Sequence, residues 1–124
     1  MAQTLYEKEI KKILKKTKTN MEAIGTYKSE FDATIRMYAE TKYQYDKLME
    51  EFFEQGCKVT EEYTNKAGFT NIRKTATYLA IETIRKDLIS HETVLGLTPA
   101  GLKKIHAKID SKKSGLAKAL KSFE

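Results

Sequence analysis

Apolar side chains recur with a helical period in the middle of the chain. The positions are separated by three, four or seven residues, namely Tyr27, Phe31, Ile35, Tyr38, Tyr45, Leu48 and Phe52. Such spacing predicts one long amphipathic helix. We expect it to begin near Thr19 or Asn20, either of which could cap it, and to end at Gly56, which suits a helix C-cap. A helix of that length needs a partner along its side.

A second periodic stretch supplies the partner. Ile81, Ile84, Leu88 and Leu95 share one stripe with His91. Thr75 can cap the start of this helix, and Gly96 can end it. Between the two helices, residues 57–72 read CKVTEEYTNKAGFTNI, which is rich in strand-forming residues and has turn composition at 65–68. This connection is expected to be a small β-hairpin or an extended loop.

A third helix restarts within LGLTPAGLKKI, residues 95–105. Thr98 can cap it, and Pro99 suits its first position, where a missing N–H costs nothing. The stripe along this helix comprises Leu102, Ile105 and Ile109, joined by Leu116, Leu120 and Phe123 if the helix continues past Ser114 and Gly115.

The N-terminal stretch TLYEKEIKKILKK predicts one more amphipathic helix. Its apolar side carries Tyr6, Ile10, Ile13 and Leu14, and its opposite side carries Lys8, Lys11, Lys12, Lys15 and Lys16. Such a helix can lie in a membrane interface, bind a groove, or pack on the body and offer its lysines to phosphate. It can also be merely packed and solvated.

These elements predict an all-α fold, a long antiparallel helical hairpin with flanking short helices and room for a small β-hairpin in the connection. The expected units are a basic amphipathic helix at 1–20, a central hairpin that forms the oligomerisation body at 21–96, and a basic C-terminal helix and tail at 97–124. Two antiparallel helices bury one stripe each, so apolar residues off the stripes need a further partner. These residues are Met37, Tyr43, Phe53, Tyr78, Ile89 and Val94. Another copy of the chain, in a dimer or a ring, is the expected partner; the alternative is that the terminal helices cover them.

Charge is distributed unevenly along the 124 residues, whose net charge is +6. Residues 1–18 carry +4 and residues 98–124 carry +5, while the stretch between them carries −3. An acidic body with two basic ends favours polyanionic partners, nucleic acid first and an anionic membrane surface second.

Residues that would support catalysis are missing from the sequence. It contains no P-loop and no glycine-rich dinucleotide motif. His91, His106 and Cys57 do not have the spacing of a metal site or a nucleophile pair. We therefore expect no enzymatic activity, no metal and no cofactor. A single cysteine also provides no disulfide framework, which favours an intracellular protein.

The segment from Tyr63 to Ile105 contains Asn71, an IExxRKDL helix at 78–88 and GLTP at 96–99. In this order, after a long helix ending at Gly56, these features resemble the phage terminase small subunit, in the family with a Gly-Leu-Thr-Pro motif near the C-terminus. The likeness covers residues 27–105. One departure is Thr75-Ala76, where members often have Asn-Pro.

The resemblance implies a non-enzymatic part of the viral genome-packaging machinery in the cytoplasm of the bacterial host. Such a subunit would bind double-stranded viral DNA, recruit and regulate the large ATPase-nuclease subunit, and form homo-oligomers, often rings. The lysine-rich ends suggest the DNA contacts Lys11, Lys12, Lys15, Lys16, Lys103 and Lys104. Arg73 and Lys74, at the start of the second long helix, are weaker candidates.

The C-terminal stripe of Leu116, Leu120 and Phe123 is the expected contact for the large subunit. The alternative function is a peripheral membrane or partner-binding adaptor anchored by the basic N-terminal helix. A purely structural oligomer is a further rival.

Overall fold

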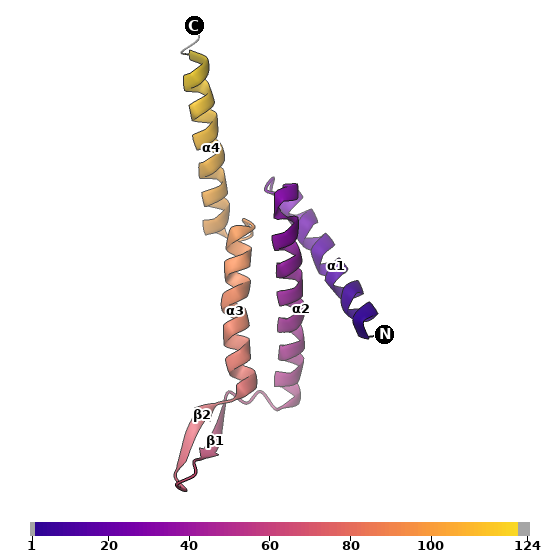
Figure 1. The fold of residues 1–124 in the computed structure, drawn as a ribbon, viewed down its shortest axis with the longest axis vertical. Coiled ribbons are helices and arrows are strands. Elements are labelled where there is room, and N and C mark those ends of the chain that lie inside the picture. The colour runs from indigo at the N-terminus through magenta and orange to yellow at the C-terminus, as the bar shows by residue number, and fades with distance from the viewer. Residues whose placement is uncertain (1, 122–124) are drawn as a thin grey trace.

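The computed structural model describes the backbone of residues 2–121 and the side chains of residues 2–108, 115 and 120. The described chain is mostly helical (Figure 1). Its elements, in order, are α1 (Ala2–Ala23), the 3-10 turn η1 (Ser29–Phe31), α2 (Asp32–Glu54), β1 (Thr60–Thr64), β2 (Thr70–Lys74), α3 (Ala76–Val94) and α4 (Pro99–Lys121).

Helices α2 and α3 form the expected antiparallel hairpin, with α1 along the other side of α2 (Figure 1). The core between them contains Met21, Ile35, Tyr38, Leu88 and Leu95, all buried. Tyr38 also donates its hydroxyl proton to Glu92 at 3.0 Å and so joins α2 to α3. Burial raises the pKa of the Tyr38 hydroxyl, and the bond to Glu92 raises it further. The predicted stripes of the two central helices are thus confirmed as the core.

Three helices end in the same way, each at a glycine with positive φ. The φ angles of Gly25, Gly56 and Gly96 are 76°, 82° and 74°. In each case the glycine N–H bonds to the carbonyl three residues back, and the next N–H bonds to the carbonyl five residues back. This is the Schellman motif, which satisfies the last carbonyls of a helix. The expected helix ends at Gly56 and Gly96 are confirmed.

The expected start of the first long helix, near Thr19 or Asn20, is wrong. Gly25 ends α1 there, and the chain turns back before α2 starts at Asp32. Tyr27 therefore lies in the turn, where it packs against the core and donates its hydroxyl proton to Asp32 at 2.8 Å. The first helix therefore continues past its expected end near residue 20 to Ala23, and the long helix starts later than expected, at Asp32.

The expectation that the flanking helices would be short is wrong. Helix α1 has 22 residues and α4 has 23, against 23 for α2 and 19 for α3. Helix α1 buries its predicted apolar side against α2, with Ile10 and Met21 fully inaccessible. Tyr6 on α1 meets Tyr43 on α2 edge to face, with ring centroids 5.1 Å apart.

A β-hairpin occupies the connection between α2 and α3, as the strand-forming composition suggested. Strands β1 and β2 pair antiparallel, with Glu62 opposite Ile72 and Glu61 opposite Arg73. At the turn, the side-chain oxygen of Asn65 accepts from the N–H groups of Ala67 and Phe69, each at 3.0 Å. Every strand residue is exposed, and the hairpin extends beyond the end of the helices (Figure 1).

The restart at α4 follows the expected chemistry. Pro99 is the first helical residue, and Thr98 accepts the N–H of Gly101 at 3.1 Å. Gly101 lies so close to Thr93 that a β-carbon there would overlap the Thr93 carbonyl group. The helical backbone continues past Gly115 to Lys121, and α4 extends away from the hairpin (Figure 1). The side chains of Ile109 and Leu116, and Phe123 as a whole, lie outside the described residues.

Candidate nucleic-acid interface

The lysines of α1 form one exposed surface, which we call the lysine face: Lys8, Lys11, Lys12, Lys15 and Lys16. Among the described residues, Lys12 is the member that has a carboxylate within 4.0 Å, Glu9 at 3.4 Å on its own helix. That pair is well exposed and contributes little stability. The lysine face therefore presents its ammonium groups to solvent.

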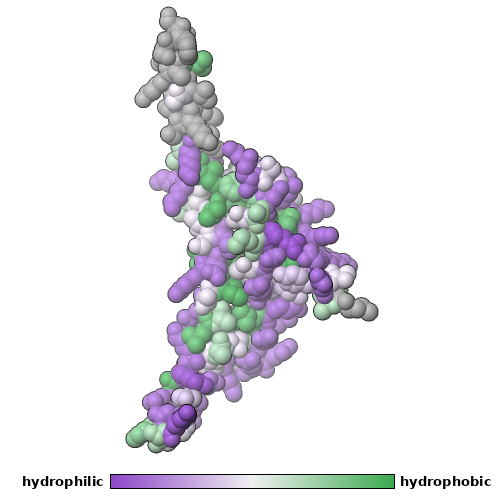
Figure 2. Space-filling model, in the orientation of Figure 1, coloured by the Kyte–Doolittle hydropathy of each residue, from purple (hydrophilic) through white to green (hydrophobic). Residues whose placement is uncertain are grey.

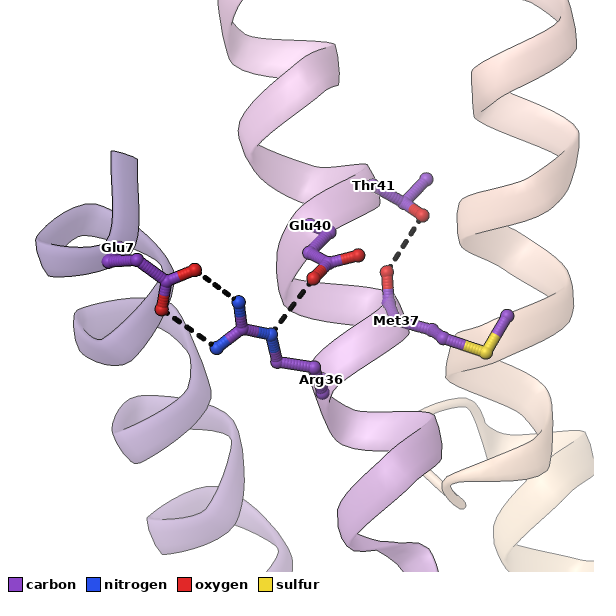
Figure 3. Close-up of polar contacts among 5 residues, drawn as sticks. All are labelled: Glu7, Arg36, Met37, Glu40 and Thr41. Carbon is purple, nitrogen blue, oxygen red and sulfur yellow. Dashed lines mark hydrogen bonds and ion pairs between the residues drawn. The ribbon is translucent and has the colours of Figure 1, made fainter. Parts of the chain in front are cut away.

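An ion-pair network fixes how α1 lies on α2 (Figure 3). The Arg36 guanidinium on α2 bonds both carboxylate oxygens of Glu7 on α1, one of them at 3.1 Å, while its Nε bonds Glu40 at 2.9 Å. The bonds from Arg36 hold the pKa of the Glu7 carboxyl below its usual value. Those from Glu7 and Glu40 raise the pKa of Arg36, which stays charged. A planar guanidinium bonded to two carboxylates sets a defined orientation of the helix.

Burial on one side of α1 and exposure on the other follow from this packing. Ile10 is inaccessible to solvent, and Ile13 and Leu14 are half-buried. Because the apolar side is held against α2, the opposite side cannot rotate inward. Several ammonium groups along one helix face suit the regularly spaced phosphates of a nucleic acid.

The first turns of α4 carry a second basic group. Lys103 and Lys104 are both exposed. Lys104 lines a groove of about 370 Å³ together with Lys28, from the turn after α1, and Lys108. Lys103 is not among the lining residues, because it lies about 100° around the helix from Lys104. The two neighbouring lysines therefore face different surroundings.

Arg73 and Lys74 have partners within the chain. Both lie in β2 and precede α3. Arg73 bonds Glu61 across the hairpin at 3.1 Å and stacks over the Tyr63 ring at 4.0 Å. Lys74 lies 2.8 Å from Glu82, whose hydrogen bond raises the pKa of the lysine. A phosphate would have to compete with these carboxylates, so the two residues are weaker DNA candidates than the lysine face.

The six residues expected to mediate oligomerisation divide into two groups. Met37, Phe53, Ile89 and Val94 are 55–62% exposed. Tyr43 and Tyr78 are half-buried within the chain. Tyr43 packs against Tyr6, and the Tyr78 ring lies 6.2 Å from that of Phe52, so α1 and α2 already cover much of both. Met37 lies on the other side of α2 from Arg36 and points towards α3 (Figure 3).

Helical periodicity did not identify the groove at the start of α4. Lys28 lies in a turn and Lys108 lies two turns into α4, so no local spacing links them. The exposed apolar residues of the β-hairpin, Phe69 at 69% and Ile72 at 75%, were also not identified as surface features. Their β-branched and aromatic character pointed to strands, but not to which side chains would be covered.

In the part of the chain that the structure describes, no three or more His, Cys, Asp or Glu residues are arranged to hold a metal ion. Among the same residues, no helix is long and apolar enough to cross a membrane.

Comparison with known proteins identifies a family. The family model described as "Phage terminase, small subunit" matches residues 11–112. That range runs from the lysine face through both central helices and the Gly-Leu-Thr-Pro turn into α4. No curated protein and no solved structure matches the chain.

Proposed function

The chain belongs to the phage terminase small-subunit family and has a role in phage genome packaging, and from that premise we propose that it binds double-stranded viral DNA through the lysine face of α1. In this proposal the protein works in the cytoplasm of the bacterial host as a homo-oligomer, arranged as a ring. It recruits and regulates the large ATPase-nuclease subunit and catalyses no reaction itself.

The observation that carries this proposal is the asymmetry of α1. One side is held to α2 by Ile10, by the Tyr6–Tyr43 contact and by the Glu7–Arg36 ion pair. The other side presents the lysine face to solvent. A rigid helix carrying cations at regular spacing can neutralise successive phosphates without ordering a flexible tail, which lowers the entropic cost of binding. Lys103 on α4 adds a contact in the same proposal.

Oligomerisation is supported by exposed apolar side chains on both central helices. Met37, Phe53, Ile89 and Val94 are each more than half exposed, although they belong to helices that form the core. Apolar side chains of this size on a small protein mark an interaction surface when they gather into patches. Figure 2 shows apolar surface where α4 joins the helical hairpin and again near the other end of that hairpin.

Contact with the large subunit through the end of α4 remains part of the proposal. Leu120, on the predicted stripe, is 67% exposed. Deleting residues 111–124 should weaken co-purification of the large subunit, while DNA binding through α1 stays unchanged. Undiminished capture of the large subunit by the shortened chain would exclude this contact.

The alternative of a membrane anchor on α1 is less compatible with the packing. A helix in a membrane interface buries its apolar side among lipids. On α1 that side is occupied by α2, since Ile10 is inaccessible and Leu14 packs against the core. Among the described residues of α1, the large apolar side chain that remains well exposed is Leu5, at 65%. Lipid binding would therefore require α1 to detach.

The decisive experiment is the salt dependence of binding to duplex DNA. Each phosphate neutralised contributes roughly −0.9 to the slope of log affinity against log salt. Replacing Lys11, Lys12, Lys15 and Lys16 together by Gln should therefore flatten the slope by about 3 to 4 and weaken binding at low salt.

A matched control removes four exposed lysines from the body of the protein: Lys47, Lys58, Lys66 and Lys86. This variant has the same net charge as the first, so a difference between them reports position and not total charge. We expect its slope to stay close to that of the unaltered protein. Equal slopes for the two variants would show that the lysine face of α1 does not contact the DNA.

A further inference from the structure

The groove at the start of α4 combines an apolar lining with a basic rim. Its apolar lining includes Phe31, Val94 and Ile105, and Gly25 and Gly101 also line it. Its charged lining residues are Lys28, Lys104 and Lys108, with no carboxylate among the residues that line it. The volume of about 370 Å³ is at the lower end of the range for ligand pockets and suits one or two large side chains. The surface is therefore suited to an apolar side chain flanked by acids.

The charges around the groove are unfavourable for the free chain. The first turn of α4 contains no acid, and Lys103 and Lys104 follow it directly. A helix N-terminus carries a partial positive charge and favours anions. No described carboxylate lies within 4.0 Å of Lys28, Lys104 or Lys108 among the ion pairs of the structure. An incoming carboxylate would offset both the partial positive charge of the helix N-terminus and the charge of these lysines.

A segment with the complementary chemistry lies at the far end of α2. Phe53 is 62% exposed there, and Glu50 and Glu54 lie within about 100° of it around the helix. The last turn of α2 contains no basic residue, although a helix C-terminus favours cations. Glu50 has one partner, Lys47, at 3.4 Å in a well-exposed pair that contributes little stability. This end of α2 therefore carries excess negative charge, whereas the groove carries excess positive charge.

We propose that the groove at the start of α4 receives the Phe53 corner of a second copy of this chain, with Glu50 and Glu54 of that copy against Lys104 and Lys108. The occupant is identified by charge complementarity: the groove lacks acids, and the corner presents an aromatic ring between two of them. This inference rests on the proposed homo-oligomer and identifies the surfaces that form it. It also unites two of the residues expected to mediate oligomerisation, because Val94 lines the groove and Phe53 fills it.

The arrangement determines how the copies are related. The groove lies at the α4 end of the helical hairpin, and Phe53 lies at the end next to the strands (Figure 1). The two surfaces lie at opposite ends of the helical hairpin, so the contact is heterologous. The α4 end of one copy meets the strand end of the next. Heterologous contacts close into a ring when the rotation between copies permits it, and otherwise continue as a filament.

The test is a charge exchange followed by sedimentation velocity on the full chain. Lys104→Glu with Lys108→Glu makes the groove acidic, and Glu50→Lys with Glu54→Lys makes the corner basic. Like charges then face each other, which opposes association. Each double variant should weaken self-association at least about tenfold, and the fourfold variant that combines them should return to within about threefold of the unaltered protein, because opposite charges again meet. Phe53→Ala should weaken association without altering the charge.

Control substitutions reverse one charge on each of the two helices away from the contact. Lys103→Glu lies outside the groove on α4, and Glu51→Lys lies on α2 about 160° from Phe53. This pair should leave self-association unchanged. Because all of these side chains are exposed, circular dichroism should show the helical content of every variant unaltered.

The outcomes separate this contact from the proposed function. If the unaltered protein stays monomeric at high concentration, the proposed homo-oligomer fails. If it associates and the charge-reversed variants associate equally well, or if combining them does not restore association, the groove is not the interface and another surface forms the oligomer.

Discussion

Helices α1 and α4 are similar in length and composition but pack differently against the central hairpin. Both are amphipathic and lysine-rich, with 22 and 23 residues, and each is joined to the central hairpin by a short turn after a Schellman glycine. Helix α1 folds back along α2, whereas α4 continues away from α3 (Figure 1). The first helix has a buried face over most of its length, and the second meets the body mainly at its start.

The turns account for much of this difference. Between Gly25 and α2 the chain has an extended Lys28 and a 3-10 turn, enough for a reversal of direction. Between Gly96 and Pro99 there are two residues, and Gly101 packs directly on Thr93. A full reversal there would separate Gly101 from Thr93. Amphipathic pattern alone therefore does not determine whether a helix is covered by its own chain, since the turn decides where its apolar side can reach.

The largest effect on stability is expected from weakening the attachment of α1 to α2. Ile10→Ala removes a fully buried side chain between α1 and α2 and should cost about 2–5 kcal/mol of unfolding free energy. Urea unfolding at a fixed protein concentration measures it. Leu5→Ala, at a residue 65% exposed on the same helix, should stay within about 0.5 kcal/mol of the unaltered protein. Equal losses for the two variants would show that α1 is not packed as described.

The next effect concerns the attachment of α4. Gly101→Ala places a methyl group against the Thr93 carbonyl and should cost about 1–3 kcal/mol as the two helices separate. Gly115→Ala is the matched substitution on the same helix, where a β-carbon meets nothing within 4 Å. It should stabilise the helix by about 0.5–1 kcal/mol, because alanine favours helix over glycine. Thermal unfolding of both variants should therefore shift in opposite directions, and a shared direction would contradict the close contact at Gly101.

A smaller effect should follow from loss of the cap on α4. Thr98→Ala leaves the N–H of Gly101 without its side-chain acceptor and should cost about 1 kcal/mol. Thr83 provides the comparison, since it is exposed within α3 and bonds only the Leu79 carbonyl of its own helix. Its replacement by Ala should be close to neutral. Circular dichroism during thermal unfolding distinguishes the two; equal shifts would mean that Thr98 does not stabilise the start of α4.

The smallest effect is a pH dependence confined to α1. The Glu7 carboxyl has a lowered pKa in the folded protein because of its bonds to Arg36. Its contribution is therefore fully present above the ordinary glutamate pKa and is lost as pH falls through the lowered, folded value. Glu7→Gln should reduce stability at pH 7 and have a smaller effect at pH 3, whereas Glu30→Gln, at an exposed residue of η1, should show no such trend. A Glu7→Gln effect that is independent of pH would contradict the role of this ion pair.

Local spacing predicted the stripes of α2 and α3, the caps at Thr75 and Thr98 and the lysine face correctly as elements of structure. It failed at Gly25, because Tyr27 and Phe31 happen to continue the spacing of Ile35 across the turn. Both residues pack against the core, so their apolar character was informative even though the helix assignment was wrong.

Features that depend on distant segments could not be predicted from spacing. The ion pair of Arg73 depends on the strand register that places Glu61 opposite it. The groove requires Gly25, Val94 and Ile105 to meet, and these residues belong to three separate elements or turns. The burial of Tyr43 likewise depends on α1 reaching it with Tyr6. In each case the reversal of the chain after α1, or the pairing of the strands, had to be known first.

Native mass measurement of the full chain, with and without duplex DNA, tests the central claim most directly. That claim is that exposed apolar surface joins copies of the chain and that lysine faces held outward by packing grip the DNA backbone. We expect a defined multiple of the chain mass at low salt, and a further species heavier by one duplex when DNA is added. A single chain that retains no DNA, even at high protein concentration and low salt, would contradict the account.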